Sequence, residues 1–330
     1  MDARRGTRSS APATLTPTPA MKLPTSPARN ATLALLTAML PWLTPTPGRA
    51  EKIWAATSTL LSSFDSATPL TLQSSTTITG LTAGYGIRAM DFRPSNGLLY
   101  ALAYNSSAAT PEQLYTLNLS TGAATLVGSL GVDFGASFGG MAFDPVADVI
   151  RLTRFSNASN GQIRIDPATG AVLATDTALA YAPGDANSGA VTNLEGLAYS
   201  PAAGGATTAY GMVWSNTLAD NRLVRIGDVG GSPAGAASGQ VHTIGSLGIA
   251  SIGNSWTMDI SEATGIAYAT DTSNRFFTIN LTTGASTLIG SMAAGSAYGL
   301  AVAPVPEPGS ALLLAVGGAL ALGRRRRMTI

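Results

Sequence analysis

A short apolar phrase recurs five times along the middle of this 330-residue chain, and its recurrence restricts the possible fold more than any other feature. Large apolar residues occupy its first and third positions, and a small or acidic residue occupies the second. Such alternation with a period of two is typical of a half-buried β-strand. Successive copies lie 42 to 61 residues apart, which fits propeller blades better than helical repeats of roughly 34 residues. The copies are MDFRP at 90–94, MAFDP at 141–145, LAYSP at 197–201, MDISE at 258–262 and LAVAP at 300–304.

Further strand-like segments follow each copy except the last, so that each of these units holds four short strands, the content of one propeller blade. The third and fourth strands are joined by an Asx-x-x-Thr-Gly tip at 118–122, 166–170 and 280–284, with a degenerate copy at 65–68. The Asx side chain accepts backbone N–H groups two residues further on, and the glycine takes the left-handed conformation that closes the hairpin. The turn already explains the aspartates at this position, which makes calcium ligation the weaker alternative.

The two ends of the repeat fit closure of a ring. The last phrase has no strands after it, whereas three strands at 53–57, 58–64 and 70–79 precede the first phrase. Joining them builds a fifth blade from both termini and leaves no free sheet edge. The sequence therefore predicts an all-β fold over residues 51–305, a β-propeller of five four-stranded blades closed by the N- and C-terminal strands.

The N-terminal 50 residues differ from this body. Residues 1–20 are rich in Pro, Thr, Ser and Ala, which favours disorder or a true start at Met21. After Met21 come basic residues, an apolar run and the sequence GRA, whose small residues suit a signal-peptidase cut before Glu51. We therefore expect residues 1–50 to be a disordered leader and a signal peptide for export.

The C-terminus combines three features in order: Pro306-Glu307-Pro308, an apolar stretch, and a cluster of basic residues. A helix over 309–323 would span about 22 Å, less than the roughly 30 Å of the hydrocarbon core. Snorkelling of the basic side chains and local thinning of the bilayer close that gap, and the basic end is expected on the cytoplasmic side. The basic cluster consists of Arg324, Arg325, Arg326 and Arg327.

This tail resembles the PEP-CTERM sorting signal of exported bacterial proteins. The resemblance implies that residues 306–330 form the sorting signal and that an exosortase-type transpeptidase processes the chain at Pro306-Glu307-Pro308. It also implies a Gram-negative bacterium, transient anchoring in the inner membrane through a single C-terminal hydrophobic helix, and a final location at the cell surface or outside the cell. Such bacteria usually make exopolysaccharide or biofilm.

The body resembles an uncharacterised bacterial family, domain of unknown function 4394. The resemblance rests on the Asx-x-x-Thr-Gly tips, the Ala-x-x-Leu-x-Gly strands that follow them, and the segment YAPGDAN at 181–187. The family brings no established activity and no catalytic residues. Insertions around 227–239 depart from the regular blade and blur its third-to-fourth hairpin.

Several kinds of chemistry are excluded or disfavoured by composition. The chain has no cysteine and one histidine, which excludes disulfides, cysteine-ligated metals, thiol nucleophiles and any site with two imidazoles. The G-x-S-x-G match at 135–139 is followed by a strand rather than a helix, so we interpret it as a position of the repeat. His242 lies in a strand-like run without neighbouring carboxylates, and the glycine-rich segment 227–235 lacks the lysine of a phosphate loop. We therefore expect no cofactor and no resident metal.

The strongest acidic candidates are Asp91 and Asp259, which occupy the second position of two copies of the phrase. Two carboxylates in a confined site act as acid and base on a glycan, or hold a cation. The alternative, which we favour, is that they make hydrogen bonds between blades. Arg88, Glu195 and Trp256 lie just upstream in their own copies and are expected to line one mouth of the channel.

The formal net charge of +1 is an average over unlike parts. Residues 51–308 keep nine basic and 17 acidic groups, a net charge of about −8, with the basic residues scattered among the blades. Such a body disfavours nucleic acid and other polyanions and leaves cations, neutral glycans or basic proteins as easier partners. We expect an exported, non-catalytic propeller that binds or scaffolds, linked to exopolysaccharide. The alternative is a propeller-type glycan lyase or hydrolase with an acidic central pocket.

Overall fold

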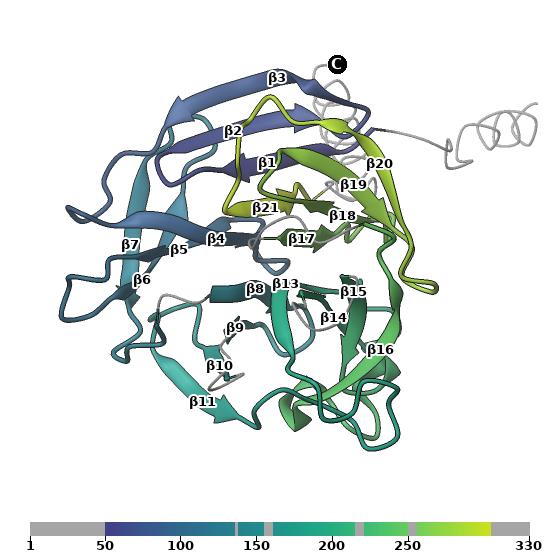
Figure 1. Cartoon of the computed structure of the whole chain (residues 1–330). Coiled ribbons are helices and arrows are strands. Elements are labelled where there is room, and N and C mark those ends of the chain that lie inside the picture. Colours follow the sequence, from purple (N-terminus) through teal and green to yellow (C-terminus); the bar gives the residue numbers. More distant parts are fainter. Residues whose placement is uncertain (1–49, 136–137, 155–160, 215–220, 250–255, 305–330) are drawn as a thin grey trace, which may run out of the picture. The chain divides into compact units, whose positions relative to one another are not determined.

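Five β-sheets surround a common centre in the computed structural model (Figure 1). The structure describes residues 50–304 except 136–137, 155–160, 215–220 and 250–255. The described strands confirm the predicted five-bladed β-propeller. The expected leader and signal peptide, apart from Ala50, and the expected sorting tail with its hydrophobic helix lie outside the described residues.

Three blades have the expected four antiparallel strands, and each begins at the centre with one copy of the phrase. Blade 1 consists of β4 (Gly86–Phe92), β5 (Leu99–Tyr104), β6 (Glu112–Leu117) and β7 (Ala124–Ser129). Blade 2 consists of β8 (Phe138–Asp144), β9 (Val149–Arg154), β10 (Gln162–Ile165) and β11 (Val172–Asp176). Blade 4 consists of β17 (Thr257–Ile260), β18 (Ala267–Thr270), β19 (Arg275–Ile279) and β20 (Ser286–Ser291).

Blade 3 departs from the four-strand pattern. Its strands are β13 (Asn193–Tyr199), β14 (Ala209–Trp214), β15 (Arg222–Ile226) and β16 (Gln240–Ser246), and a short outer strand, β12 (Ala180–Tyr181), pairs in parallel with β16. The connection between β15 and β16 contains the 3-10 turns η2 (Val229–Gly231) and η3 (Ala236–Ser238), where an insertion was expected. Within the described ranges, no helix has the length and apolarity needed to cross a membrane.

Blade 5 is built from both ends of the repeat, as predicted. The last strand, β21 (Gly299–Val302), pairs antiparallel with β1 (Lys52–Ala56), and β2 (Leu60–Asp65) and β3 (Thr68–Thr77) complete the sheet. Figure 1 shows β21 between β1 and the centre of the ring.

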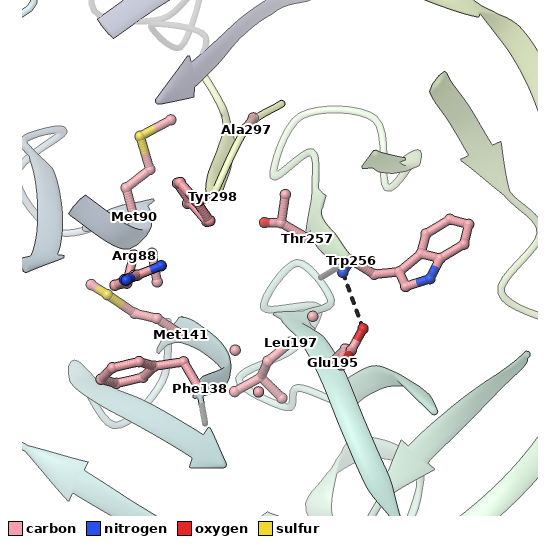
Figure 2. Close-up of a pocket in the computed structure, with 14 residues that line it drawn as sticks. Arg88, Met90, Phe138, Met141, Glu195, Leu197, Trp256, Thr257, Ala297 and Tyr298 are labelled. Atoms are coloured by element: carbon pink, nitrogen blue, oxygen red, sulfur yellow. Dashed lines mark hydrogen bonds between the residues drawn. The ribbon is translucent and has the colours of Figure 1, made fainter. Parts of the chain in front are cut away.

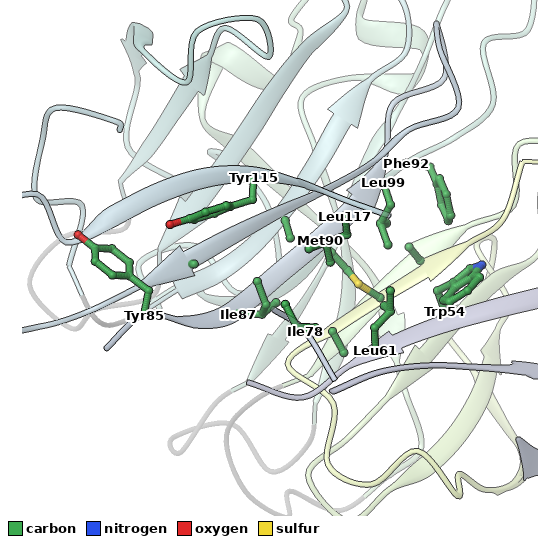
Figure 3. Packing of buried hydrophobic residues seen from close by; sticks show 14 residues of the cluster. Trp54, Leu61, Ile78, Tyr85, Ile87, Met90, Phe92, Leu99, Tyr115 and Leu117 are labelled. Atoms are coloured by element: carbon green, nitrogen blue, oxygen red, sulfur yellow. The ribbon is translucent and has the colours of Figure 1, made fainter. Parts of the chain in front are cut away.

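The hydrophobic core is divided among the five seams between neighbouring blades. In β8, Met141 and Phe143 pack toward blade 1, whereas Ala142 between them packs toward blade 3. The first and third positions of the phrase therefore face the preceding blade, and the second faces the following one. Figure 3 shows one such seam, in which Trp54 of blade 5 lies in the same cluster as Met90 of blade 1.

The Asx-x-x-Thr-Gly tips have the chemistry expected from their sequence. Asn118 Oδ1 accepts the N–H groups of Ser120 and Thr121, both at 3.0 Å. Gly122 closes the turn at φ +71°, in the left-handed region that favours glycine. The same bonds recur in the blade 4 tip, where Asn280 Oδ1 accepts the N–H groups of the second and third residues after it.

These tips also hold the rim of the ring together, because each lies against the outer strand of the preceding blade. A Cβ atom built on Gly128 of β7 would lie 2.0 Å from the carbonyl oxygen of Thr169, in the tip of blade 2. On Gly245 of β16 it would lie 2.1 Å from the carbonyl oxygen of Thr283, in the tip of blade 4. The absence of a side chain at Gly128 and at Gly245 therefore leaves the space into which the neighbouring tip fits.

We predict that Gly128→Ala destabilises the ring. The added methyl group must displace a backbone carbonyl, and such overpacking costs about 1–3 kcal/mol. For a domain of this size, that lowers Tm by roughly 2–4 °C for each kcal/mol. Thermal unfolding followed by circular dichroism measures the effect.

Gly290→Ala is the matched control. Gly290 occupies the same position of β20, but its neighbour is the tip that has Pro69 in place of glycine, and a Cβ there would meet the Pro69 ring at 3.4 Å. The control should lose clearly less stability than Gly128→Ala. Equal losses would contradict a specific role for the fit between tip and glycine.

Candidate functional site

The two ends of the central channel are lined by different parts of the five inner strands. Residues at or just before the strand starts, such as Arg88 and Tyr298, surround a cavity at one end, which we call the mouth. Residues at or just after the strand ends, such as Phe92 and Pro304, surround a smaller cavity at the other end, which we call the closed end.

The closed end contains both aspartates of the recurring phrase. Asp91 Oδ2 accepts the N–H of Phe143 in blade 2 at 2.7 Å. Asp259 Oδ2 accepts the N–H of Val302 in blade 5, also at 2.7 Å. Each carboxylate thus reaches across one seam to the inner strand of the next blade. The cavity between them has a volume of about 20 Å³, which is room for roughly one water molecule.

Burial is the main cause that raises the pKa of both aspartates. It raises the pKa of Asp259 to about 7, because hydrogen bonds from Val302 and Ile260 only partly offset the loss of hydration. Burial, and next the repulsion from Asp259, raise the pKa of Asp91 well above its usual range. Glu262 lines the same cavity, and burial raises its pKa as well. The closed end therefore holds protons at a pH where exposed carboxyls have lost them.

The mouth opens into a cavity of about 110 Å³ (Figure 2). Glu195 Oε2 accepts the backbone N–H of Trp256 at 3.2 Å, which joins blades 3 and 4 at this level. The Trp256 ring points away from the cavity and packs at 5.8 Å from the ring of Phe277 in blade 4. Trp256 is therefore mainly a core residue, and Arg88 and Glu195 are the charged side chains that line the mouth.

An open recess of about 390 Å³ adjoins the mouth over the seam between blades 5 and 1. Arg88 and Tyr298 line both the recess and the mouth cavity, and the Arg88 guanidinium lies over the Tyr298 ring at 4.9 Å from its centroid. The rest of its lining comes from the β1–β2 turn, the start of β4 and the end of β5, namely Ser58, Thr59, Gly84, Tyr85, Gly86 and Tyr104.

The five candidate residues are thus divided between the two ends of the channel. The structure brings Asp91 and Asp259 together at the closed end, and it places Arg88, Glu195 and Trp256 together at the mouth. Asp91 and Asp259 come later along their inner strands than Arg88, Glu195 and Trp256 come along theirs. This difference in position separates the two groups along the channel.

The structure also places two sequence features that were weighed as possible catalytic groups, the G-x-S-x-G match and the single histidine. Gly139, the last residue of the G-x-S-x-G match, lies inside β8, where a Cβ atom would meet the carbonyl oxygen of Leu194 at 2.2 Å. His242 lies in β16, with its Nε2 3.9 Å from a carboxylate oxygen of Asp228. Within the described ranges, no group of three or more acidic or histidine side chains is arranged to hold a metal ion.

Glu112, the first residue of β6, is a buried acidic residue that no sequence motif marks. Its Oε1 accepts the N–H of Gly135 at 2.9 Å, which ties down the segment that leads into β8. The side chain is fully buried, and its Oε2 has no hydrogen-bond partner among the described residues. Burial raises the pKa of Glu112 to about 7. It lies outside the recurring phrase, so the pattern gave no signal for it.

The segment YAPGDAN has a structural role in blade 3. Asp185 accepts the N–H of Thr243 at 2.7 Å and its hydroxyl at 2.9 Å, and Asn187 donates to the same hydroxyl at 2.7 Å. Arg222 donates to Asn187 Oδ1. These bonds join the segment to β16 and β15 beside the parallel strand β12.

Comparison with known proteins gives two matches to family models. One is described as a domain of unknown function (DUF4394) and matches residues 60–301. The other is the PEP-CTERM protein-sorting motif, which matches residues 304–327. The sorting motif implies export, processing by an exosortase and transient association with the membrane. No curated protein is a significant match to the chain.

Solved structures of similar shape have low sequence identity. A chain of a nidogen/laminin complex is 12% identical, with 77% of this chain and 98% of that chain covered and a TM-score of 0.46. A protein of unknown function from Bacteroides thetaiotaomicron VPI-5482 is 15% identical, with 79% and 68% covered and a TM-score of 0.45.

We predict that the raised pKa of Asp259 makes the propeller more stable in mild acid. A carboxyl whose pKa rises on folding stabilises the protein fully below its unfolded value of about 4, and this stabilisation is lost as the pH rises through about 7. Within that window each such group lowers the free energy of unfolding by up to about 1.4 kcal/mol per pH unit. Asp259→Asn keeps an acceptor for Val302 and should flatten the dependence of Tm on pH.

Asp148→Asn is the control for this experiment. Its hydrogen bond to Arg93, the largest cause, holds the pKa of Asp148 below its usual range, so its contribution changes only below pH about 4. The control should keep the wild-type slope between pH 4 and 7. A slope that is unchanged in Asp259→Asn would show that this carboxyl does not titrate as described.

Proposed function

The chain belongs to the DUF4394 family, and we propose that it is an exported, non-catalytic propeller that binds its ligand at the mouth. Its place of action is the surface or the surrounding matrix of a Gram-negative cell. There it serves as a binding or scaffolding protein associated with exopolysaccharide. The export signal on which this proposal builds is the sorting motif.

The observation that carries the proposal is the difference between the two ends of the channel. Strand β21 starts next to Tyr298 at the mouth and ends before Pro304 at the closed end. The sorting motif begins at residue 304, so the described chain leaves the propeller at the closed end. While the tail anchors the protein, the mouth faces away from the point of attachment, which suits it to meet a ligand outside.

The geometry of the carboxylates supports a non-catalytic role. Both Asp91 and Asp259 accept backbone hydrogen bonds across a seam, and the space beside them holds roughly one water molecule. A glycan lyase or hydrolase needs its acid and base on either side of a bound sugar. The mouth, which has more room, presents Glu195 with one oxygen engaged by the Trp256 N–H.

We predict that the full-length chain, purified with its tail in detergent, binds members of an oligosaccharide array without cleaving them. Thr257→Trp should abolish this binding, because the Thr257 side chain points into the mouth and an indole there would fill most of the cavity of about 110 Å³ (Figure 2). Glu262→Gln, at the closed end, is the control and should bind as the wild type does. Release of shortened or unsaturated products would overturn the non-catalytic role.

Removing residues 306–330 should release the protein from the membrane fraction of its host. The sorting motif accounts for membrane association, and the propeller needs none of these residues to close its ring. Immunoblots of membrane and soluble fractions measure the change, with substitution of the four tail arginines by serine as a second variant. Unchanged fractionation of both variants would contradict anchoring through the tail.

A further inference from the structure

Arg88 differs from the other arginines of the described chain in having no polar partner. Five of them form ion pairs with carboxylates, while Arg154 and Arg222 donate hydrogen bonds to Phe134 O and Asn187 Oδ1. Its guanidinium lies over the ring of Tyr298, and no hydrogen bond or ion pair joins it to an acceptor among the described residues. The five paired residues are Arg93, Arg151, Arg164, Arg225 and Arg275.

The N–H donors of Arg88 are available for a ligand, because none of them has an acceptor among the described residues. A guanidinium carries five N–H donors in one plane. Two parallel donors of this kind match the two oxygens of a carboxylate. Arg88 is exposed, and it stands between the mouth cavity and the recess.

The residues that line the recess indicate which class of carboxylate ligand would fit it. It consists of tyrosines, hydroxyl side chains and glycines around Arg88, with no aliphatic side chain among its residues. Tyrosine combines an apolar face with a polar tip, and serine and threonine each both donate and accept. This combination suits a sugar ring, which has apolar C–H faces and hydroxyl edges. It offers no apolar pocket to the aliphatic side chains of a peptide.

The charge distribution restricts where the carboxylate binds. The described lining of the recess contains no acidic residue, whereas Glu195 lines the deeper cavity. The body as a whole carries a net charge of about −8, so it does not attract an anionic ligand at long range. Recognition of such a ligand therefore depends on direct contact. A short acidic saccharide satisfies both conditions better than a long polyanion.

We infer that the recess binds a carboxylated saccharide, a uronic acid unit or its equivalent, with Arg88 pairing the carboxylate and Tyr298 supporting the guanidinium. This inference rests on the proposed function, because the recess adjoins the mouth and shares Arg88 and Tyr298 with it. No bond is made or broken in the saccharide. Arg88 acts as a specificity-determining residue that distinguishes an acidic sugar from its neutral counterpart.

The test compares an acidic tetrasaccharide with its neutral ester and with an acidic peptide. Isothermal titration calorimetry of the full-length chain is run with galacturonic acid tetramers, with the same tetramers fully methyl-esterified, and with tetraglutamate. We expect binding of the free acid to be at least about tenfold tighter than that of the ester, the loss typical of a hydrogen bond to a charged group. Arg88→Gln should remove that preference, and Arg88→Lys should restore only part of it.

Lys52→Gln is the matched control, because it removes one exposed positive charge from the first residue of β1, outside the lining of the recess. It should leave the preference for the free acid unchanged. Equal binding of acid and ester that Thr257→Trp abolishes would overturn this inference and leave the proposed function standing. Binding of tetraglutamate alone would assign the recess to acidic peptides and overturn the inference. No binding of any oligosaccharide, including the wider array, would overturn both proposals.

Discussion

The pairing of β1 with β21 is the contact on which the rest of the ring depends. It aligns Ile53 with Val302 and gives blade 5 its inner strand from the opposite end of the repeat. The chain has no cysteine, so this closure is entirely non-covalent. Glu51, just before β1, reinforces it across the next seam, where its carboxylate accepts hydrogen bonds from Tyr268 at 2.8 Å and from Ser261 and Thr264. Hydrogen bonding along one strand pair thus replaces the disulfides that many exported domains use.

Closure forces the inner strands so close together that side-chain size at the centre is restricted. A Cβ atom on Gly140 would lie 2.6 Å from the backbone nitrogen of Leu197 in the next blade. The second position of the phrase, which faces the following blade, is alanine in three copies and aspartate in two. Aspartate fits there because its carboxylate accepts a hydrogen bond from a backbone N–H group of the following blade. The two cavities of the channel accordingly lie at its ends.

The fold was predictable because the repeat is encoded locally. The strand alternation, the tips and the unequal numbers of strands at the two ends were sufficient for the five-bladed ring and its closure. The fifth strand of blade 3 was not, because two residues of β12 carry no periodicity. The candidate site was predictable only in part: the phrase and the residues just before it identified Asp91 and Arg88, but their separation to opposite ends of the channel depends on the direction of the inner strands. Glu51 and Glu112 contribute through partners distant in sequence, such as Tyr268, which no local pattern marks.

The direction of the inner strands gives the ring its chemical polarity. All five run from the mouth to the closed end, so the residues just before the phrase line the mouth, whereas its aspartates line the closed end. The late positions hold Asp91 and Asp259, whose charges are suppressed by burial and used in bonds between blades. Arg88 lies just before the phrase, and its charge stays exposed and unpaired among the described residues. The direction of the inner strands therefore separates a structural acidic end from the mouth, where Arg88 and Glu195 line the space for a ligand.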